Sequence, residues 1–491
     1  MRRVLKTLII VIASAAAMAG CASGNNKIWS FDEDSEVQAG AEQHARILAQ
    51  TSAYDHTSLS DHVDAVGKKI AAVSDRPKLP WHFTVIDSAV PNAFATQGGY
   101  VYITRGMLAM LQSDDELAAV LSHEIGHICA QDTPHQEAVS NIMALGVLGT
   151  VVVAPALLLF PQVAAAPEGA GMAAMSRKAE LNADRLGTEY LHRAGYPPET
   201  MQTTMALLES METYERDQQK AAGQKPSTWW HRVYASHPTT ETREKKLAEM
   251  TSTQNPTSSV TSQPGFFTLL DGIEFGSAKF EGIPYEHKRY FLQWKLALKV
   301  PDGWFVYMDE KHKQLWLVRP DSSARMQLTR METFDLDNPC RTLAWRMLPS
   351  PLTETKKVHE HGPPSCTGLV HKSTMSLFGH HEQIFRAGVI AESKAGGYRY
   401  LFLGYANEKT FAENDPIFLS VVRSIEPILA TDARPKPLSL HIRRALPGET
   451  FASLARSSRI PGKDAESLLR LLNRRYPTGE PVAGELIKTI E

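Results

Sequence analysis

The chain has 491 residues, longer than one ordinary hydrophobic core supports, so its length predicts two to four domains. Hydrophobic residues make up 43% and charged residues 22% of the sequence, which is usual for a globular protein. A net charge of -2 leaves no basic excess to neutralise phosphates and argues against a nucleic-acid-binding protein.

The N-terminus has the pattern of an export signal that ends at a lipidated cysteine. A basic start precedes an apolar run from residue 8 to 18, which is too short to cross about 30 Å of hydrocarbon. The small residues before Cys21 resemble a bacterial lipobox, which implies removal of residues 1–20 and acylation of Cys21. Residues 21–35 are then a tether. An inner-membrane retention signal would typically place Asp directly after the cysteine, but this chain has Ala22 there. We therefore expect an anchor at the periplasmic face of the outer membrane, with ordinary secretion as the alternative.

Helices and two strands follow the tether. Apolar residues recur with a helical period between residues 32 and 73, and residues 81–86 alternate as a strand. The second strand, Gly98 to Thr104, is entered through two glycines and leads into another helix. The sequence allows it to be either an edge strand that captures an extended peptide or an interior strand.

A His-Glu-x-x-His motif closes the next predicted helix, which begins near residue 115. Its members are His123, Glu124 and His127. Residues four apart share one helix face, so the two imidazoles can hold one metal ion while Glu124 lies beside them. This pattern is typical of zinc hydrolases, and we expect one Zn²⁺ per chain.

Residues 142–166 are almost uncharged and long enough to span a membrane. If Glu180 completes a metal site with the two histidines, one crossing would place the ligands on opposite sides of the bilayer. The segment is too short to cross twice, and Pro155 and Pro161 interrupt its helix. We therefore predict an apolar hairpin or lid near the site. The alternatives are a core helix or, in an integral-membrane protease, a true span.

The following helix, residues 176–194, carries Glu180 and Asp184 four residues apart on one face. Glu180 can be the third metal ligand. Asp184 can accept a hydrogen bond from the far ring nitrogen of a ligating histidine, which fixes its tautomer and orientation.

These motifs, in this order, resemble the zinc metallopeptidase family of the HtpX and CAAX-prenyl endopeptidases, in particular its soluble periplasmic BepA-like branch. The remaining matching segments are Asn92-Ala93-Phe94-Ala95, Gly99-Tyr100-Val101, Ser176-Arg177, and Ser236-His237-Pro238 with Arg243. The resemblance implies a mainly α gluzincin peptidase domain with a small β-sheet over residues 36–255.

The same resemblance implies endopeptidase activity and assigns the site. His123, His127 and Glu180 are then the zinc ligands and Glu124 the general base. His237 matches a histidine that can approach the metal and hold the enzyme inactive, and Arg243 lies near the catalytic centre, so either could stabilise the oxyanion. The chain shows no 34-residue helical repeat, so docking through tetratricopeptide repeats is not expected.

Two further domains are predicted beyond a boundary at residues 251–263, which are rich in Thr, Ser, Gln and Pro. Residues 264–430 are expected to form an α+β accessory domain, with strands within 291–304, 315–318 and 398–404 and helices at 338–347 and 416–424. Cys340 and Cys366 can pair there in an oxidising compartment, whereas Cys129 is expected to be a small buried hydrophobe.

The last domain, residues 438–491, shows the element order βααβ and resembles a LysM module, which implies binding to peptidoglycan glycan. Taken together, the chain is predicted to be multidomain and to act as a lipid-anchored zinc metalloendopeptidase. Its expected substrates are misfolded or stalled cell-envelope proteins. The alternative is a non-catalytic, chaperone-like or peptidoglycan-binding envelope lipoprotein, although such a protein would not need Glu124.

Overall fold

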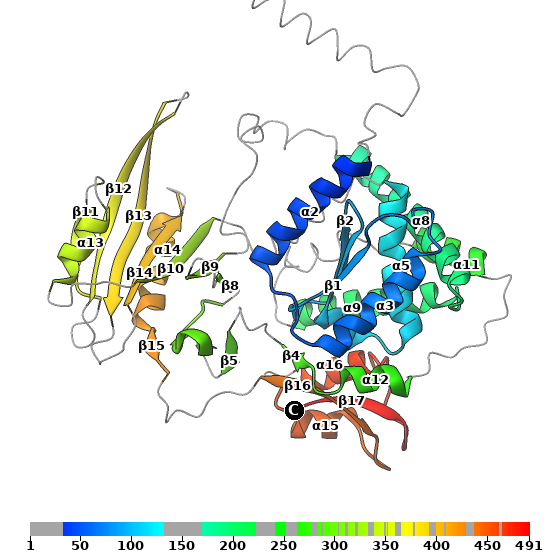
Figure 1. Cartoon of the computed structure of the whole chain (residues 1–491). Coiled ribbons are helices and arrows are strands. Elements are labelled where there is room, and N and C mark those ends of the chain that lie inside the picture. Colours follow the sequence, from blue (N-terminus) through cyan, green and yellow to red (C-terminus); the bar gives the residue numbers. More distant parts are fainter. Residues whose placement is uncertain are drawn as a thin grey trace, which may run out of the picture.

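The computed structural model describes residues 33–131, 169–221 and 241–251 and, apart from short gaps, 263–428 and 437–491 (Figure 1). Three predicted features lie outside these residues: the signal and Cys21, the apolar segment 142–166, and His237. Within the described part, no helix is both long and apolar enough to span a bilayer.

A small three-stranded sheet supports the peptidase region. Its order is β1 (His82–Ile86), β3 (Tyr100–Thr104), β2 (Ala93–Thr96), with β3 parallel to β1 and antiparallel to β2. The predicted strand that enters through Gly98 is therefore interior, which settles the choice left open by the sequence. The two edge strands are β1 and β2, and β2 is the one that contacts the helix carrying the metal-binding motif.

Helices surround this sheet, as their apolar periodicity predicts (Figure 1). One helix, α5, is buried along almost its whole length, from Glu116 to Ile128. Ser113 caps its N-terminus by accepting a hydrogen bond from the Glu116 backbone amide. The helices of this region are α2 (Glu33–Gln50), α3 (Thr57–Ala71), α4 (Arg105–Met110), α5 (Asp114–Ala130), α8 (Gly169–Arg193), α9 (Thr200–Ala221) and α11 (Glu241–Thr251).

The two helices that carry the motif residues, α5 and α8, lie unusually close. A β-carbon on Gly126 would lie only 2.8 Å from the Ala183 carbonyl oxygen. Glycine therefore lets the α5 backbone approach α8 at the level of the metal-binding motif.

The accessory domain has its own sheets and its own cores. Its seven-stranded sheet has the order β11-β12-β13-β14-β10-β9-β8, and a four-stranded sheet has the order β15-β7-β6-β5. The strands are β5 (Ile283–Tyr285), β6 (Lys288–Phe291), β7 (Leu296–Leu298), β8 (Phe305–Asp309), β9 (Gln314–Val318), β10 (Ala324–Met331), β11 (Leu352–Lys356), β12 (Ser365–Ser376), β13 (Gly379–Ala391), β14 (Arg399–Ala406) and β15 (Glu426–Pro427).

The helices of the accessory domain are α13 (Pro339–Met347) and α14 (Phe411–Arg423). The predicted disulfide between Cys340 and Cys366 is confirmed and joins α13 to β12. Residues 292–294, predicted as strand, form a short 3-10 helix instead. Cys129, in the peptidase region, is free and partly buried against the main core.

The C-terminal module has the predicted βααβ order: β16 (Leu438–Arg444), α15 (Phe451–Ser457), α16 (Ala465–Leu472) and β17 (Leu486–Ile490). It is not held only by a linker, because its apolar residues belong to the same core as those of the peptidase helices. Helix α12 (Pro264–Leu270) and strand β4 (Glu274–Phe275), which come before the accessory-domain strands in the chain, also belong to that core.

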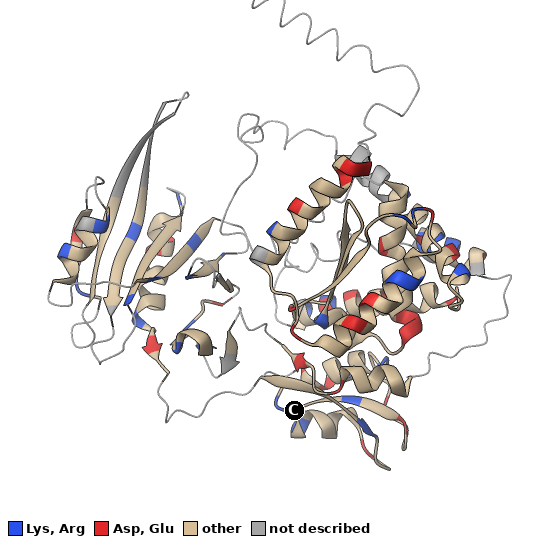
Figure 2. Cartoon of the chain, viewed as in Figure 1, with Lys and Arg blue, Asp and Glu red and all other residues tan. Residues whose placement is uncertain are grey.

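Strand β4 pairs with β16, so the chain leaves for the accessory domain and returns from it at adjacent strands. The accessory domain is thus inserted into a unit made of the peptidase region and the C-terminal module. Figure 2 shows acidic and basic residues interspersed over both parts, in keeping with the small net charge.

Candidate metal centre

Two neighbouring helices bring three potential metal ligands together. His123 and His127 come from α5 and Glu180 comes from α8, and one ligand atom of each lies within 4.8 Å of the others. The two Nε2 atoms are 3.1 Å apart. Glu180 Oε2 lies 3.4 Å from His123 Nε2, and Glu180 Oε1 lies 3.3 Å from His127 Nε2. All three residues are buried.

These separations fit a tetrahedral cation. Ligand atoms at about 2.0 to 2.2 Å from a tetrahedral Zn²⁺ lie roughly 3.3 to 3.6 Å from one another. The three observed separations agree with that range to within a few tenths of an ångström. Two imidazoles and one carboxylate are also a donor set that Zn²⁺ accepts, with a fourth position left open. The residues present therefore fit the metal that the motif predicts.

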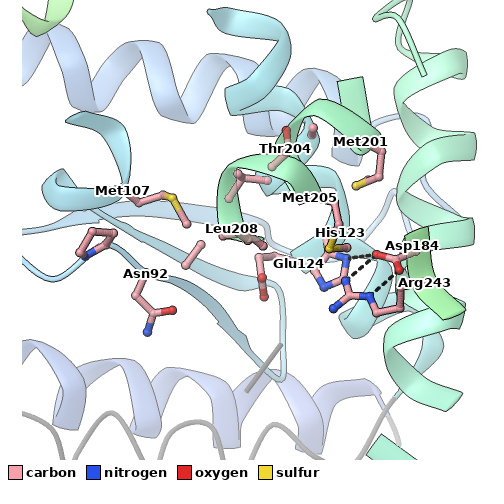
Figure 3. A pocket seen from close by; sticks show the side chains of 14 residues that line it. Asn92, Met107, His123, Glu124, Asp184, Met201, Thr204, Met205, Leu208 and Arg243 are labelled. Carbon is pink, nitrogen blue, oxygen red and sulfur yellow. Dashed lines mark hydrogen bonds and ion pairs between the residues drawn. The ribbon is translucent and has the colours of Figure 1, made fainter. Parts of the chain in front are cut away.

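A second layer of contacts orients the ligands. His123 Nδ1 lies 3.0 Å from Asp184 Oδ1, which leaves Nε2 directed at the ligand cluster. Arg243, from α11, donates to both oxygens of Asp184 at 2.7 and 2.8 Å. Its Nη1 lies 3.0 Å from Glu180 Oε2. In Figure 3, dashed lines join both His123 and Arg243 to the Asp184 carboxylate.

Burial and pairing act in opposite directions on these charges. Burial alone would raise the pKa of Asp184, but hydrogen bonds from Arg243 and His123 outweigh it and lower that pKa. Burial would likewise lower the pKa of Arg243, yet its contacts with Asp184 and Glu180 raise it. Asp184 and Arg243 are therefore a fixed ion pair, and Asp184 stays an acceptor for the His123 ring.

Glu124 lies on the opposite side of His123 from Asp184 and lines a pocket that opens beside the ligands (Figure 3). It is 3% exposed. The cavity volume of this pocket is about 60 Å³. Its lining residues are Pro91, Asn92, Ala93, Met107, Ala119, Val120, His123, Glu124, Asp184, Met201, Thr204, Met205, Leu208 and Arg243.

The predicted residues His123, Glu124, His127, Glu180, Asp184 and Arg243 thus converge on one site, and Asn92 and Ala93 lie at its pocket. Sequence analysis did not single out the wall contributed by α9, namely Met201, Thr204, Met205 and Leu208. Their spacing of three and four residues is the only signal, and it is shared by any buried helix face.

Comparison with known proteins agrees with this geometry. Residues 58–251 match peptidase family M48, whose metallopeptidases depend on zinc. The Beta-barrel assembly-enhancing protease of Escherichia coli (strain K12) is 26% identical over 219 residues, 42% of each chain. That of Yersinia pestis is 26% identical over 290 residues, 50% of this chain and 57% of its own.

The Mitochondrial metalloendopeptidase OMA1 of Schizosaccharomyces pombe is 31% identical over 218 residues, 44% of this chain and 59% of its own. The chain thus spans about half the length of these curated relatives. Among solved structures, the Ran-binding protein Mog1p of Saccharomyces cerevisiae covers 29% of this chain at 11% identity and a TM-score of 0.23, too low to carry an argument. Residues 58–251, which include the buried His123, His127 and Glu180, are thus similar to the zinc metallopeptidases of peptidase family M48.

Proposed function

We propose that the protein is a zinc-dependent endopeptidase that hydrolyses peptide bonds in misfolded or stalled cell-envelope proteins. The observation that carries the proposal is the meeting of three buried ligand atoms within 4.8 Å. Glu124, on the same helix as the two histidines, lines the adjoining pocket. The similarity to the Beta-barrel assembly-enhancing proteases supports the cell envelope as the place of action.

His123, His127 and Glu180 would hold the zinc ion, which supplies Lewis acidity to polarise a carbonyl and lower the pKa of water. Glu124 then accepts the proton of the attacking water and transfers it to the leaving amine. Asp184 holds the His123 ring, and Arg243 holds both the Asp184 and Glu180 carboxylates. The oxyanion contact expected from His237 or Arg243, and the latch expected from His237, remain predictions.

Casein digestion with and without a chelator tests this proposal. The wild-type chain should lose activity when zinc is removed and regain it when zinc is returned. The rival hypothesis, a chaperone-like lipoprotein, predicts instead that casein stays intact in every condition while aggregation of an unfolded client is suppressed. Casein left intact both by the fully zinc-loaded wild type and by a zinc-loaded His237→Ala protein, in which no latch can form, would therefore reject the peptidase.

We also propose that the protein is anchored through acylated Cys21, as its N-terminal sequence indicates. A Cys21→Ser protein should appear in the soluble periplasmic fraction, whereas the wild type should sediment with the outer membrane. If the variant still sediments with membranes after a carbonate wash, another segment holds it there and the lipid-anchor proposal is wrong.

Binding of peptidoglycan glycan by the C-terminal module is supported by two exposed apolar side chains, Leu446 (62%) and Val482 (60%). They lie on the β16–α15 and α16–β17 loops. These loops are joined by backbone hydrogen bonds of Ala445 with Gly484 and Glu485. Co-sedimentation of the full chain with purified cell-wall sacculi, lost in a Leu446→Asp, Val482→Asp double variant, is the expected result. Equal sedimentation of both proteins would refute it.

A further inference from the structure

The C-terminal module contacts two of the elements that line the pocket beside the metal ligands. Helix α16 packs against both α4 and α9, and Figure 1 shows it beside α9. Helix α9 supplies Met201 and Met205 to the pocket lining, whereas α4 and α5 supply Met107 and Glu124. The module therefore bridges two walls of the pocket, although none of its described residues lines the pocket itself.

One side of this bridge is buried and ionic. Arg474, in the loop that follows α16, forms an ion pair of 2.7 Å with Glu116 in the first turn of α5. Glu116 is 1% exposed, and its other carboxylate oxygen accepts a hydrogen bond from the Gln112 backbone amide. The Gln112 side chain donates to the Leu472 carbonyl oxygen, and the buried Lys488 amine donates to two carbonyl oxygens where α4 meets α5. The module thus holds the N-terminus of α5.

The other side of the bridge is more exposed. Two residues further along the same loop, the Tyr476 hydroxyl donates to Asp217 Oδ2 on α9 at 2.5 Å. The Tyr476 ring meets the Tyr214 ring of the same helix edge to face, with 5.5 Å between the ring centroids. One short loop, Arg474 to Tyr476, thus joins the start of the metal-binding helix to the α9 wall of the pocket.

We propose that Arg474 and Tyr476 are positioning residues of the peptidase. Arg474 sets the place of α5, and with it Glu124, whereas Tyr476 sets the place of the α9 wall. The proposal rests on the peptidase function proposed above and gives the C-terminal module a part in the reaction, besides any ligand of its own. The module acts on the reaction only through these two helices.

The geometry of α5 explains how Arg474 influences the chemistry. Glu116 precedes Glu124 by eight residues, about two turns of one continuous helix, so a shift at one end is carried to the other. Without Arg474 the buried carboxylate of Glu116 would lose its counter-charge, and the start of α5 would have to move to hydrate it. A displacement of about 1 Å at the reacting groups can lower a rate by about 10²-fold.

The two contacts predict different kinetic effects, because the two helices carry different parts of the site. Helix α5 carries the proposed base and two metal ligands, so its displacement should lower kcat. Helix α9 lines the pocket and carries none of the proposed reacting groups, so its displacement should weaken substrate binding and raise KM. A module that merely stabilised the fold would change only the amount of active enzyme, and both substitutions would then lower the apparent kcat alone.

The test measures kcat and KM for fluorescein-labelled casein with the full zinc-loaded chain. Arg474→Gln should lower kcat about ten-fold or more, with KM within about two-fold of the wild type. Arg474→Lys keeps the positive charge and should restore most of the lost kcat. Arg456→Gln is the matched control, since Arg456 is an exposed arginine of the same module, and it should leave both constants unchanged.

Tyr476→Phe removes only the hydroxyl and should raise KM about three-fold, with kcat unchanged. Tyr476→Ala also removes the ring contact and should raise KM further. Asp217→Ala should match Tyr476→Phe, and the two together should raise KM no further, because both remove the same hydrogen bond. Glu209→Gln is the control, since Glu209 is an exposed carboxylate on the same helix.

Zinc content and the unfolding midpoint are measured for every variant. If Arg474→Gln does not fold, the double variant Glu116→Gln, Arg474→Gln leaves no unpaired buried charge and should show the same loss of kcat. Wild-type constants in both the Arg474 and the Tyr476 variants, or an equal fall of kcat at unchanged KM in both, would overturn the positioning roles. Casein left intact by the wild type and by the His237→Ala protein would instead reject the peptidase function on which they rest. If only the His237→Ala protein is active, the same variants are compared in that background.

Discussion

Asp184 is the residue through which the metal site is fixed to the rest of the domain. One of its oxygens lies 3.0 Å from His123 Nδ1, and both accept hydrogen bonds from Arg243. Because Asp184 has no exposed surface, no water can replace these partners. The ring orientation of His123 therefore depends on this one carboxylate.

Replacing Asp184 with Asn should lower zinc affinity about 10- to 100-fold, since the amide removes the negative charge and one of the two acceptor oxygens. Competition with a chromophoric chelator measures this affinity. Glu189→Gln is the control, because Glu189 is a half-exposed carboxylate on the same helix and should leave zinc binding unchanged. An Asp184→Asn affinity within two-fold of the wild type would contradict the role given to Asp184.

At the scale of elements, the site depends on how closely α5 approaches α8. Gly126 lies between the two ligating histidines, and the Ala183 carbonyl that faces it immediately precedes Asp184. A methyl group at Gly126 would push α8 away and with it Glu180 and Asp184 together.

Gly126→Ala should therefore reduce both zinc affinity and thermal stability, although alanine usually favours a helix over glycine. A destabilisation of about 1 to 3 kcal/mol is expected for such overpacking, readable in denaturant unfolding. Gly265→Ala, on a helix where nothing lies within 4 Å of the added carbon, should be neutral or stabilising. The opposite ranking of the two variants would show that the helices tolerate the added volume.

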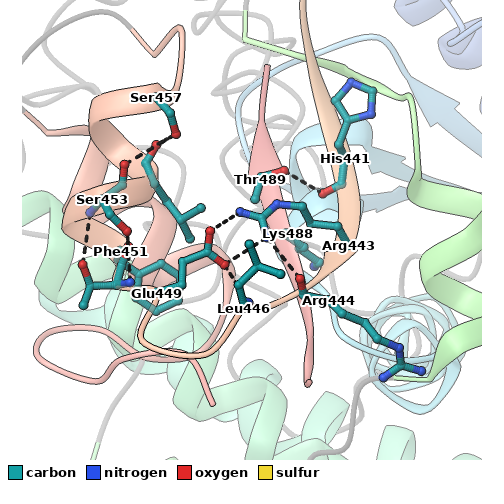
Figure 4. Close-up of polar contacts among 12 residues, drawn as sticks. His441, Arg443, Arg444, Leu446, Glu449, Phe451, Ser453, Ser457, Lys488 and Thr489 are labelled. Carbon is teal, nitrogen blue, oxygen red and sulfur yellow. Dashed lines mark hydrogen bonds and ion pairs between the residues drawn. The ribbon is translucent and has the colours of Figure 1, made fainter. Parts of the chain in front are cut away.

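Within the C-terminal module, a pH-sensitive contact joins strand β16 to the loop that follows it (Figure 4). Glu449 accepts hydrogen bonds from the Arg443 guanidinium and from the Leu446 backbone amide. The Arg443 contact, only partly opposed by burial, lowers the pKa of Glu449 below its ordinary 4.5. The contact stabilises the fold fully above that ordinary pKa, and the contribution is lost as pH falls through the lower, folded-state pKa.

A double-mutant cycle of Arg443→Gln and Glu449→Gln should thus give a coupling of about 0.5 to 1 kcal/mol at pH 7, because solvent screens the partly exposed pair. Denaturant unfolding at pH 7 and pH 2.5 measures it, and the coupling should shrink at pH 2.5. A coupling that is equal at both pH values would mean that the charge of Glu449 contributes nothing.

Local pattern predicted the elements well and their packing poorly. The βααβ order and the helices that carry His123 and Glu180 follow from periodicity and spacing. The pairing of Cys340 with Cys366 follows from their place in one domain and an oxidising compartment. Helix α14, however, begins at Phe411 and not near Pro416, so proline lies inside it. Proline costs a helix one hydrogen bond, and burial of Phe418, Val421 and Val422 against the sheet outweighs that loss.

Contacts between distant segments leave even less trace in sequence. The lysine of the last strand, Lys488, is fully buried, although lysine in an alternating strand predicts a solvent-facing position. Its amine donates to the carbonyl oxygens of Ala109 and Leu111, directly before the cap of α5. Burial lowers its pKa well below the usual value, partly opposed by Glu116. Such a partner some 380 residues away is set by the tertiary fold.

At the scale of the whole molecule, two units with separate cores are expected to unfold separately. One core joins the peptidase helices to the C-terminal module, and the others belong to the accessory domain. Zinc should stabilise only the first unit, because all three ligands lie there.

Lys488→Met should lower the stability of the zinc-dependent transition by about 1 to 3 kcal/mol, since it leaves two buried carbonyl groups without a donor. Phe402→Ala, in the accessory core, should lower only the other transition. Calorimetry with and without chelator identifies which is which. A single transition that both variants shift equally would show that the accessory domain is not independent.

The rate of casein hydrolysis by a Glu124→Gln protein that carries one zinc ion per chain tests the central claim most directly. The substitution keeps His123, His127 and Glu180 but removes the carboxylate proposed to accept the proton of the attacking water. We predict a rate about 10²- to 10⁴-fold below that of the wild type, with zinc content unchanged. A rate within a few-fold of the wild type would contradict the proposed peptidase mechanism.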